Sequence, residues 1–104
     1  MNLNYLSGKP FYLSSEETAW VSKTMEGMTV REKCGQLFVI LGNACSDEER
    51  AELISDLGAG GILFRPAPSE TVRRQYDEAD SLAKIPLLRA ANLEEGGAGV
   101  SSGA

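Results

Sequence analysis

The stretch LFVIL at residues 37–41 is an unbroken apolar run rich in residues that favour strands. A strand that is covered on both faces of a parallel sheet has this composition, whereas a half-exposed strand alternates apolar with polar residues. Two similar runs follow, GGILF at residues 60–64 and PLLRAA at residues 86–91, and proline is tolerated at the first position of a strand. The sequence therefore predicts three short buried strands.

Helix-start signals stand before and between these strands. A serine followed three residues later by a glutamate forms a capping box, and this pattern occurs at Ser14 with Glu17 and again at Ser46 with Glu49. A glycine just after a helical pattern ends it, as Gly58 does here. The predicted helices run over about residues 15–27, 30–35, 47–57 and 70–83.

The order of these elements defines the fold class. Two helices lead, and strand, helix, strand, helix, strand follow with short connections, which by the right-handed crossover rule gives parallel strands covered by helices. A closed (β/α)₈ barrel typically needs about 250 residues, and this chain has 104. We expect an α/β structure of about three parallel strands with helices, preceded by two helices, and not a closed barrel.

Composition excludes several classes of partner. The net charge is −5, with 15 acidic against 10 basic residues, which argues against nucleic-acid binding. No stretch approaches the roughly 18 to 20 apolar residues of a membrane span, and residues 1–9 do not resemble a signal peptide, so we expect no membrane partner and a cytoplasmic location. The chain has no histidine and two cysteines without a CxxC pair, so neither a metal site nor a cofactor is expected.

Three motifs resemble glycoside hydrolase family 3. MTVREKCGQLF at residues 28–38 is similar to the family's MTLEEKIGQLF before its first strand, and LGAGGILF at residues 57–64 is similar to LGVGGVILF. Residues 85–94, IPLLRAANLE, are similar to IPLLIAADLE. The motifs occur in order and register, and the resemblance covers residues 13–99. It implies that residues 14–104 are the N-terminal fragment of a (β/α)₈ TIM barrel, truncated in the loop after strand three, behind an N-terminal extension over residues 1–13.

The resemblance also implies a function for the longer protein. The chain looks closest to the β-N-acetylhexosaminidase branch, with β-glucosidase as the alternative, and these are retaining enzymes with an aspartate nucleophile and a histidine–aspartate acid/base pair. All of those catalytic groups are expected beyond Ala104, so the isolated chain should be inactive. The rival interpretation is a small non-enzymatic α/β interaction module, but the chain ends within a glycine- and serine-rich loop, which favours truncation.

Asn92 and Glu94 are the candidate substrate-binding residues. They follow the third strand, and barrel enzymes build their sites just past the C-terminal ends of strands. The family usually has aspartate at the position of Asn92, where it is a ligand for sugar hydroxyls, and an amide can still hydrogen-bond a hydroxyl. The alternative is that both residues only solvate and cap the loop. Glu94 and Glu95 do not read as a catalytic pair, because sequence neighbours rarely converge on one bond at the required separation of about 5–9 Å.

Four further expectations concern packing. Arg89 stands where the family has a buried aliphatic residue, so its role in strand three is open. The first and third strands would have open edges, through which the fragment would self-associate. Cys34 should pack as a small buried residue. An approximate apolar stripe that includes Trp20 should pack the first long helix against the core.

Overall fold

The computed structural model describes residues 2–103 and divides into two compact units, Met1–Val30 and Arg31–Ala104. The first unit contains a short 3₁₀ helix, η1 (Asn4–Ser7), and the helix α1 (Ser15–Gly27). The predicted domain boundary after residue 13 stays a prediction. Among the described residues, no helix combines the length and the apolar character needed to cross a bilayer.

The capping box at the start of α1 is confirmed. The Ser14 hydroxyl accepts a hydrogen bond from the backbone N–H of Glu17 at 3.1 Å, and the Glu17 carboxylate accepts one from the Ser14 N–H at 2.7 Å. No residue of α1 is buried, and Trp20 remains 55 % exposed. Within its own unit α1 contacts the four-residue η1, which is too short to cover the stripe, and the packing of this stripe against later elements stays a prediction.

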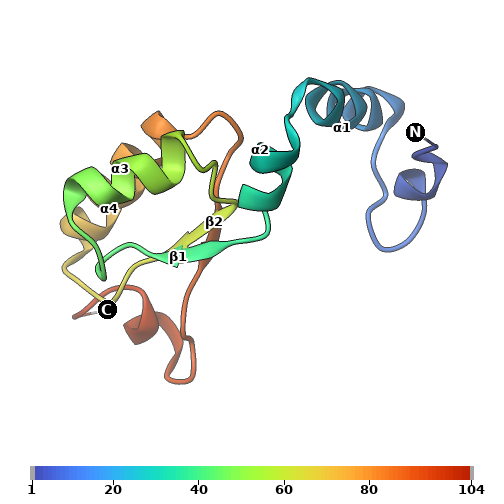
Figure 1. The fold of residues 1–104 in the computed structure, drawn as a ribbon. Coiled ribbons are helices and arrows are strands. Elements are labelled where there is room, and N and C mark those ends of the chain that lie inside the picture. Colours follow the sequence, from blue (N-terminus) through green and yellow to red (C-terminus); the bar gives the residue numbers. More distant parts are fainter. Residues whose placement is uncertain (1, 104) are drawn as a thin grey trace. The chain divides into compact units, whose positions relative to one another are not determined.

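The second unit carries the predicted alternation of strands and helices, which Figure 1 follows from the teal α2 to the red C-terminal segment. Its elements are α2 (Val30–Gly35), β1 (Val39–Leu41), α3 (Asp47–Ser55), β2 (Gly61–Leu63), α4 (Ser69–Leu82), β3 (Leu88–Ala90) and the 3₁₀ helix η2 (Gly96–Gly99). The sheet has the order β1-β2-β3, and both pairings are parallel. The prediction of an α/β fold with three parallel strands is confirmed.

One row of the sheet faces the helices. Ile40, Ile62 and Arg89 lie opposite one another in register, and Ile62 is fully buried. The core joins Ile62 to residues of α3 and α4, and these two helices contact each other on the same side of the sheet (Figure 1). The buried members of this core are Ile54, Ile62, Phe64, Val72, Tyr76, Ala79 and Leu87.

The opposite face of the sheet is open, and here the sequence-based expectation is wrong. Val39 is 57 % exposed and Leu88 is 73 % exposed. Successive side chains of a strand point to opposite faces, and both residues stand one position away from the row that packs on α3 and α4. These strands therefore carry apolar side chains on both faces of the sheet, although helices cover only one face.

The first strand is also shorter than its apolar run. The N–H of Leu37 donates to the carbonyl of Cys34 at 3.1 Å, and the N–H of Phe38 donates to that of Gly35 at 3.0 Å. Both amides are used to close the end of α2, so the strand begins at Val39. The same geometry leaves Cys34 exposed on a short helix, which contradicts its expected burial.

The helix signals around α3 are confirmed. The Ser46 hydroxyl accepts from the Glu49 N–H at 3.1 Å, and the Glu49 carboxylate accepts from the Ser46 N–H at 2.8 Å. After the helix, Gly58 adopts a φ of 73°, and the Ala59 N–H then donates to the Leu53 carbonyl at 3.0 Å. A left-handed residue at this place is the usual way to end a helix, and glycine reaches it without strain.

Candidate functional site

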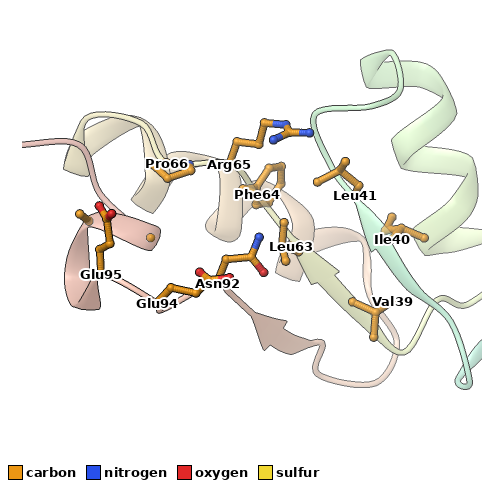
Figure 2. Close-up of a pocket in the computed structure, with 12 residues that line it drawn as sticks. Val39, Ile40, Leu41, Leu63, Phe64, Arg65, Pro66, Asn92, Glu94 and Glu95 are labelled. Carbon is orange, nitrogen blue, oxygen red and sulfur yellow. The ribbon is translucent and has the colours of Figure 1, made fainter.

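A hollow of about 680 Å³ opens at the carboxyl ends of the three strands. The connections that follow β1, β2 and β3 all reach this edge, because parallel strands end on the same side of a sheet. In open α/β sheets and in (β/α)₈ barrels this is the edge where ligands bind. The hollow is lined by Val39, Ile40, Leu41, Leu63, Phe64, Arg65, Pro66, Asn92, Glu94, Glu95, Ala98 and Gly99, of which Figure 2 labels ten.

Hydrogen bonds between side chains and backbone groups hold the first two of these connections in place. The Asn43 side-chain oxygen accepts a hydrogen bond from the Arg65 N–H at 2.6 Å, which joins the loop after β1 to the end of β2. The Arg50 guanidinium of α3 donates to the Gly42 carbonyl at 2.8 Å and forms an ion pair with Asp47. The rim of the hollow is thus fixed by side chains that bond the loop backbones directly.

Both predicted substrate-binding residues line the hollow. Asn92 follows β3 by two residues, and Glu94 is two residues further along. Figure 2 shows the Asn92 amide between Leu63 and Glu94, and no hydrogen bond engages this amide within residues 2–103. All three polar residues of this loop, Asn92, Glu94 and Glu95, are exposed to solvent. The amide therefore has both a donor and an acceptor available to a ligand.

Two polar residues that sequence reasoning did not select also line the hollow. Glu95 is there beside Glu94, and Arg65 comes from the end of β2. Figure 2 shows the Arg65 side chain extending toward the end of β1, away from both glutamates. Within residues 2–103, neither an ion pair nor a hydrogen bond engages its guanidinium. Arg65 could have been selected from the sequence, because it directly follows an apolar run that was predicted to be a strand.

The segment after β3 forms one wall of the hollow. The turn η2 supplies Ala98 and Gly99 to the lining. Beyond it, Ser101 pairs with Ala67 in a parallel bridge, and the Ser102 N–H donates to the Ala67 carbonyl at 3.0 Å. The glycine-rich end of the chain is thereby tied to the connection after β2.

The chemistry of the hollow suits a polar ligand that also has apolar faces. Its lining combines buried Phe64 and apolar residues of β1 and β2 with one amide, two carboxylates and one guanidinium. Such a combination of an apolar lining with a few oriented polar groups is typical of small-molecule sites. Over the described part of the chain, no group of three or more His, Cys, Asp or Glu side chains is placed to hold a metal ion.

Parallel strands with their helices on one side, and a ligand-sized hollow past the strand ends, define the opening part of a (β/α)₈ barrel. No family model matches the sequence. The chain is 34 % identical over 91 residues to the β-N-acetylglucosaminidase/β-glucosidase of Cellulomonas fimi, which covers 88 % of this chain and 16 % of that protein. We conclude that the chain belongs to glycoside hydrolase family 3.

Two solved structures agree with this assignment. The β-glucoside phosphorylase BglX bound to 2FGlc matches with a TM-score of 0.78 and 31 % identity over 98 % of this chain and 19 % of that one. A second structure of β-glucoside phosphorylase BglX matches with a TM-score of 0.75 and 30 % identity, over 98 % of this chain and 18 % of that one. The chain thus spans less than a fifth of the length of these relatives.

Proposed function

We propose that this chain supplies the first strands of the catalytic barrel of a retaining β-glycosidase that removes terminal β-linked sugars in carbohydrate metabolism. The observation that carries the proposal is the position of Asn92 and Glu94 in the hollow at the strand ends. A carbohydrate is therefore the proposed ligand. We also propose that the protein is cytoplasmic and binds neither nucleic acid nor a membrane. These proposals rest on the acidic composition and on the absence of long apolar runs.

The role proposed for these residues is substrate binding. An amide can donate to one sugar hydroxyl and accept from another, and a carboxylate can accept from two. The nucleophile and the acid/base pair would come from later parts of the barrel, because a retaining mechanism needs two groups on opposite sides of the glycosidic bond. On this proposal the 104-residue chain binds one side of the sugar and is inactive alone.

β-N-Acetylglucosaminides are the proposed substrates, with β-glucosides as the alternative. The name of the Cellulomonas fimi relative includes both activities. The test is to assay the longer protein that contains this chain with nitrophenyl N-acetyl-β-glucosaminide and nitrophenyl β-glucoside, beside the 104-residue chain at equal concentration. Hydrolysis by the longer protein alone is expected. Turnover by the isolated chain would contradict the proposed division of the site, and a longer protein inactive on both would favour a non-enzymatic interaction module.

Transfer of the sugar to phosphate is a second candidate reaction. The two solved structures described above are named β-glucoside phosphorylases, and Arg65 is one of the residues that line the hollow. Arginine is well suited to bind a phosphate through two parallel hydrogen bonds, although Glu94 and Glu95, which line the same hollow, repel an anion. The distinguishing experiment repeats the assay with inorganic phosphate and measures the sugar 1-phosphate product. Equal rates with and without phosphate, and free sugar as the product, would leave hydrolysis as the reaction.

A further inference from the structure

The turn η2 passes so close to the backbone of Asn92 that a side chain does not fit between them. A Cβ atom placed on Gly99 would lie 1.5 Å from the carbonyl oxygen of Asn92 and 2.7 Å from its carbonyl carbon. Non-bonded carbon and oxygen atoms do not approach so closely, and the neighbour here is backbone rather than the movable end of a side chain. Glycine at position 99 is therefore required by this contact.

Backbone conformation does not explain the same glycine. Gly96 and Gly103 adopt φ values of 71° and 83°, which favour glycine. Gly99 is not among the positive-φ glycines of the described chain. The requirement at position 99 is thus close approach to Asn92, and it is separate from the turn geometry of the loop.

The turn cannot simply move away from Asn92, because it is held on both sides. On the inner side, the Gly96 N–H donates to the Leu93 carbonyl at 3.0 Å. On the outer side, Val100 packs against the core, and the Ser102 N–H donates to the Ala67 carbonyl at 3.0 Å. An atom added at Gly99 would consequently displace the Asn92 peptide group, and this peptide is bonded to the Cα that carries the amide side chain.

We infer that Gly99 is a positioning residue, which fixes the direction of the Asn92 side chain by seating η2 against the Asn92 carbonyl. This inference rests on the proposed sugar-binding role of Asn92. Both residues line the hollow, so the turn forms its wall and orients one of its polar groups. A side chain held in one orientation binds a ligand without first being ordered, which strengthens binding.

The contact itself is tested in the 104-residue chain, independently of any activity. Gly99→Ala should shift the side-chain NH₂ signals of Asn92 in a ¹H–¹⁵N spectrum. The matched control is Gly27→Ala, because a Cβ at Gly27 meets nothing within 4 Å, and it should leave these signals in place. Unmoved Asn92 signals in a folded Gly99→Ala chain would overturn the inference.

A second variant covers the case in which Gly99→Ala fails to fold. Ser102→Pro removes the N–H that bonds to Ala67 and adds no atom beside Asn92. It frees the outer side of the turn, so it should also shift or broaden the Asn92 NH₂ signals. Sharp, unshifted signals in that variant would show that the turn does not orient Asn92.

A double-mutant cycle in the longer enzyme tests the functional step. Gly99→Ala should raise KM more than it lowers kcat, with a loss in kcat/KM no larger than that of Asn92→Ala. In an Asn92→Ala background the same change should cost less than about twofold, because the group it positions has been removed. Equal losses in both backgrounds would overturn the inference. If Asn92→Ala alone is without effect, the sugar-binding role of Asn92 fails, and the spectra still decide whether Gly99 orients its side chain.

Discussion

The guanidinium carbon of Arg89 lies 4.8 Å from the centroid of the Tyr76 ring. The same guanidinium forms an ion pair with Asp80 at 2.5 Å, so one side chain of β3 contacts two residues of α4. Tyr76 in turn contacts Phe64 edge to face, with ring centroids 5.1 Å apart. Arg89, which the sequence left without a role, therefore fastens the third strand to the helix that covers it.

Replacing Arg89 should measurably weaken the fold. A cation above an aromatic ring contributes about 0.5–1 kcal/mol at exposed sites, and a half-exposed ion pair adds about 0–1 kcal/mol because solvent screens it. Arg89→Ala should therefore lower the free energy of unfolding by about 1 kcal/mol in urea titrations. The control is Arg73→Ala on α4, whose side chain forms no ion pair within residues 2–103 and should change stability by less than about 0.5 kcal/mol. Equal effects of the two changes would remove the structural role of Arg89.

Gly60 should tolerate no side chain. A Cβ at this position would lie 2.0 Å from the backbone carbonyl oxygen of Gln36, so the end of α2 and the start of β2 would have to separate. Gly60→Ala should lower the free energy of unfolding by about 2 kcal/mol or more, as overpacking against rigid backbone does. Gly27→Ala, which meets nothing within 4 Å, should be neutral or stabilise the chain by up to about 1 kcal/mol. A Gly60→Ala chain as stable as the control would show that this contact is easily relaxed.

The open edges of the sheet should make the isolated chain self-associate. β1 and β3 are the outer strands, and Leu88 of β3 is 73 % exposed. Unpaired strands invite pairing with another chain, and a charged residue on the edge opposes it. Light scattering should show mass increasing with concentration, and Leu88→Lys should reduce this more than Val30→Lys on α2. A stable monomer that melts cooperatively at high concentration would contradict the prediction.

Asn92→Ala should reduce the activity of the longer enzyme and spare its stability. The substitution removes one donor and one acceptor from the proposed sugar site, which should cost about 1–3 kcal/mol, or roughly ten- to a hundredfold in kcat/KM. Because Asn92 is exposed, Tm should hardly change. Asn92→Asp restores the residue usual in the family and should retain substrate binding. An unchanged kcat/KM, or a Tm that falls in step with activity, would identify Asn92 as a residue that only structures the loop.

Local sequence patterns were sufficient to predict the helices and strands and their order. Ser46 and Glu49 specify the start of α3 through hydrogen bonds within one turn, and Gly58 specifies its end through its own φ. Such signals depend on residues a few positions apart, so they act wherever the segment lies. The position of Asn92 and Glu94 at the hollow was predictable for a similar reason, because both follow a strand whose end lies at the binding edge of the sheet.

The contacts between residues that are distant in the sequence could not be predicted in this way. Asn43 bonds the Arg65 backbone across 22 residues, Gly99 fits against the Asn92 carbonyl, and Arg89 reaches over Tyr76. Each of these contacts depends on how strands, helices and loops pack against one another, and the apolar periodicity of the sequence does not predict that packing. The exposure of Val39 and Leu88 also depends on tertiary packing. An apolar run contains residues suited to burial, and the segments that pack upon the run decide whether they are buried.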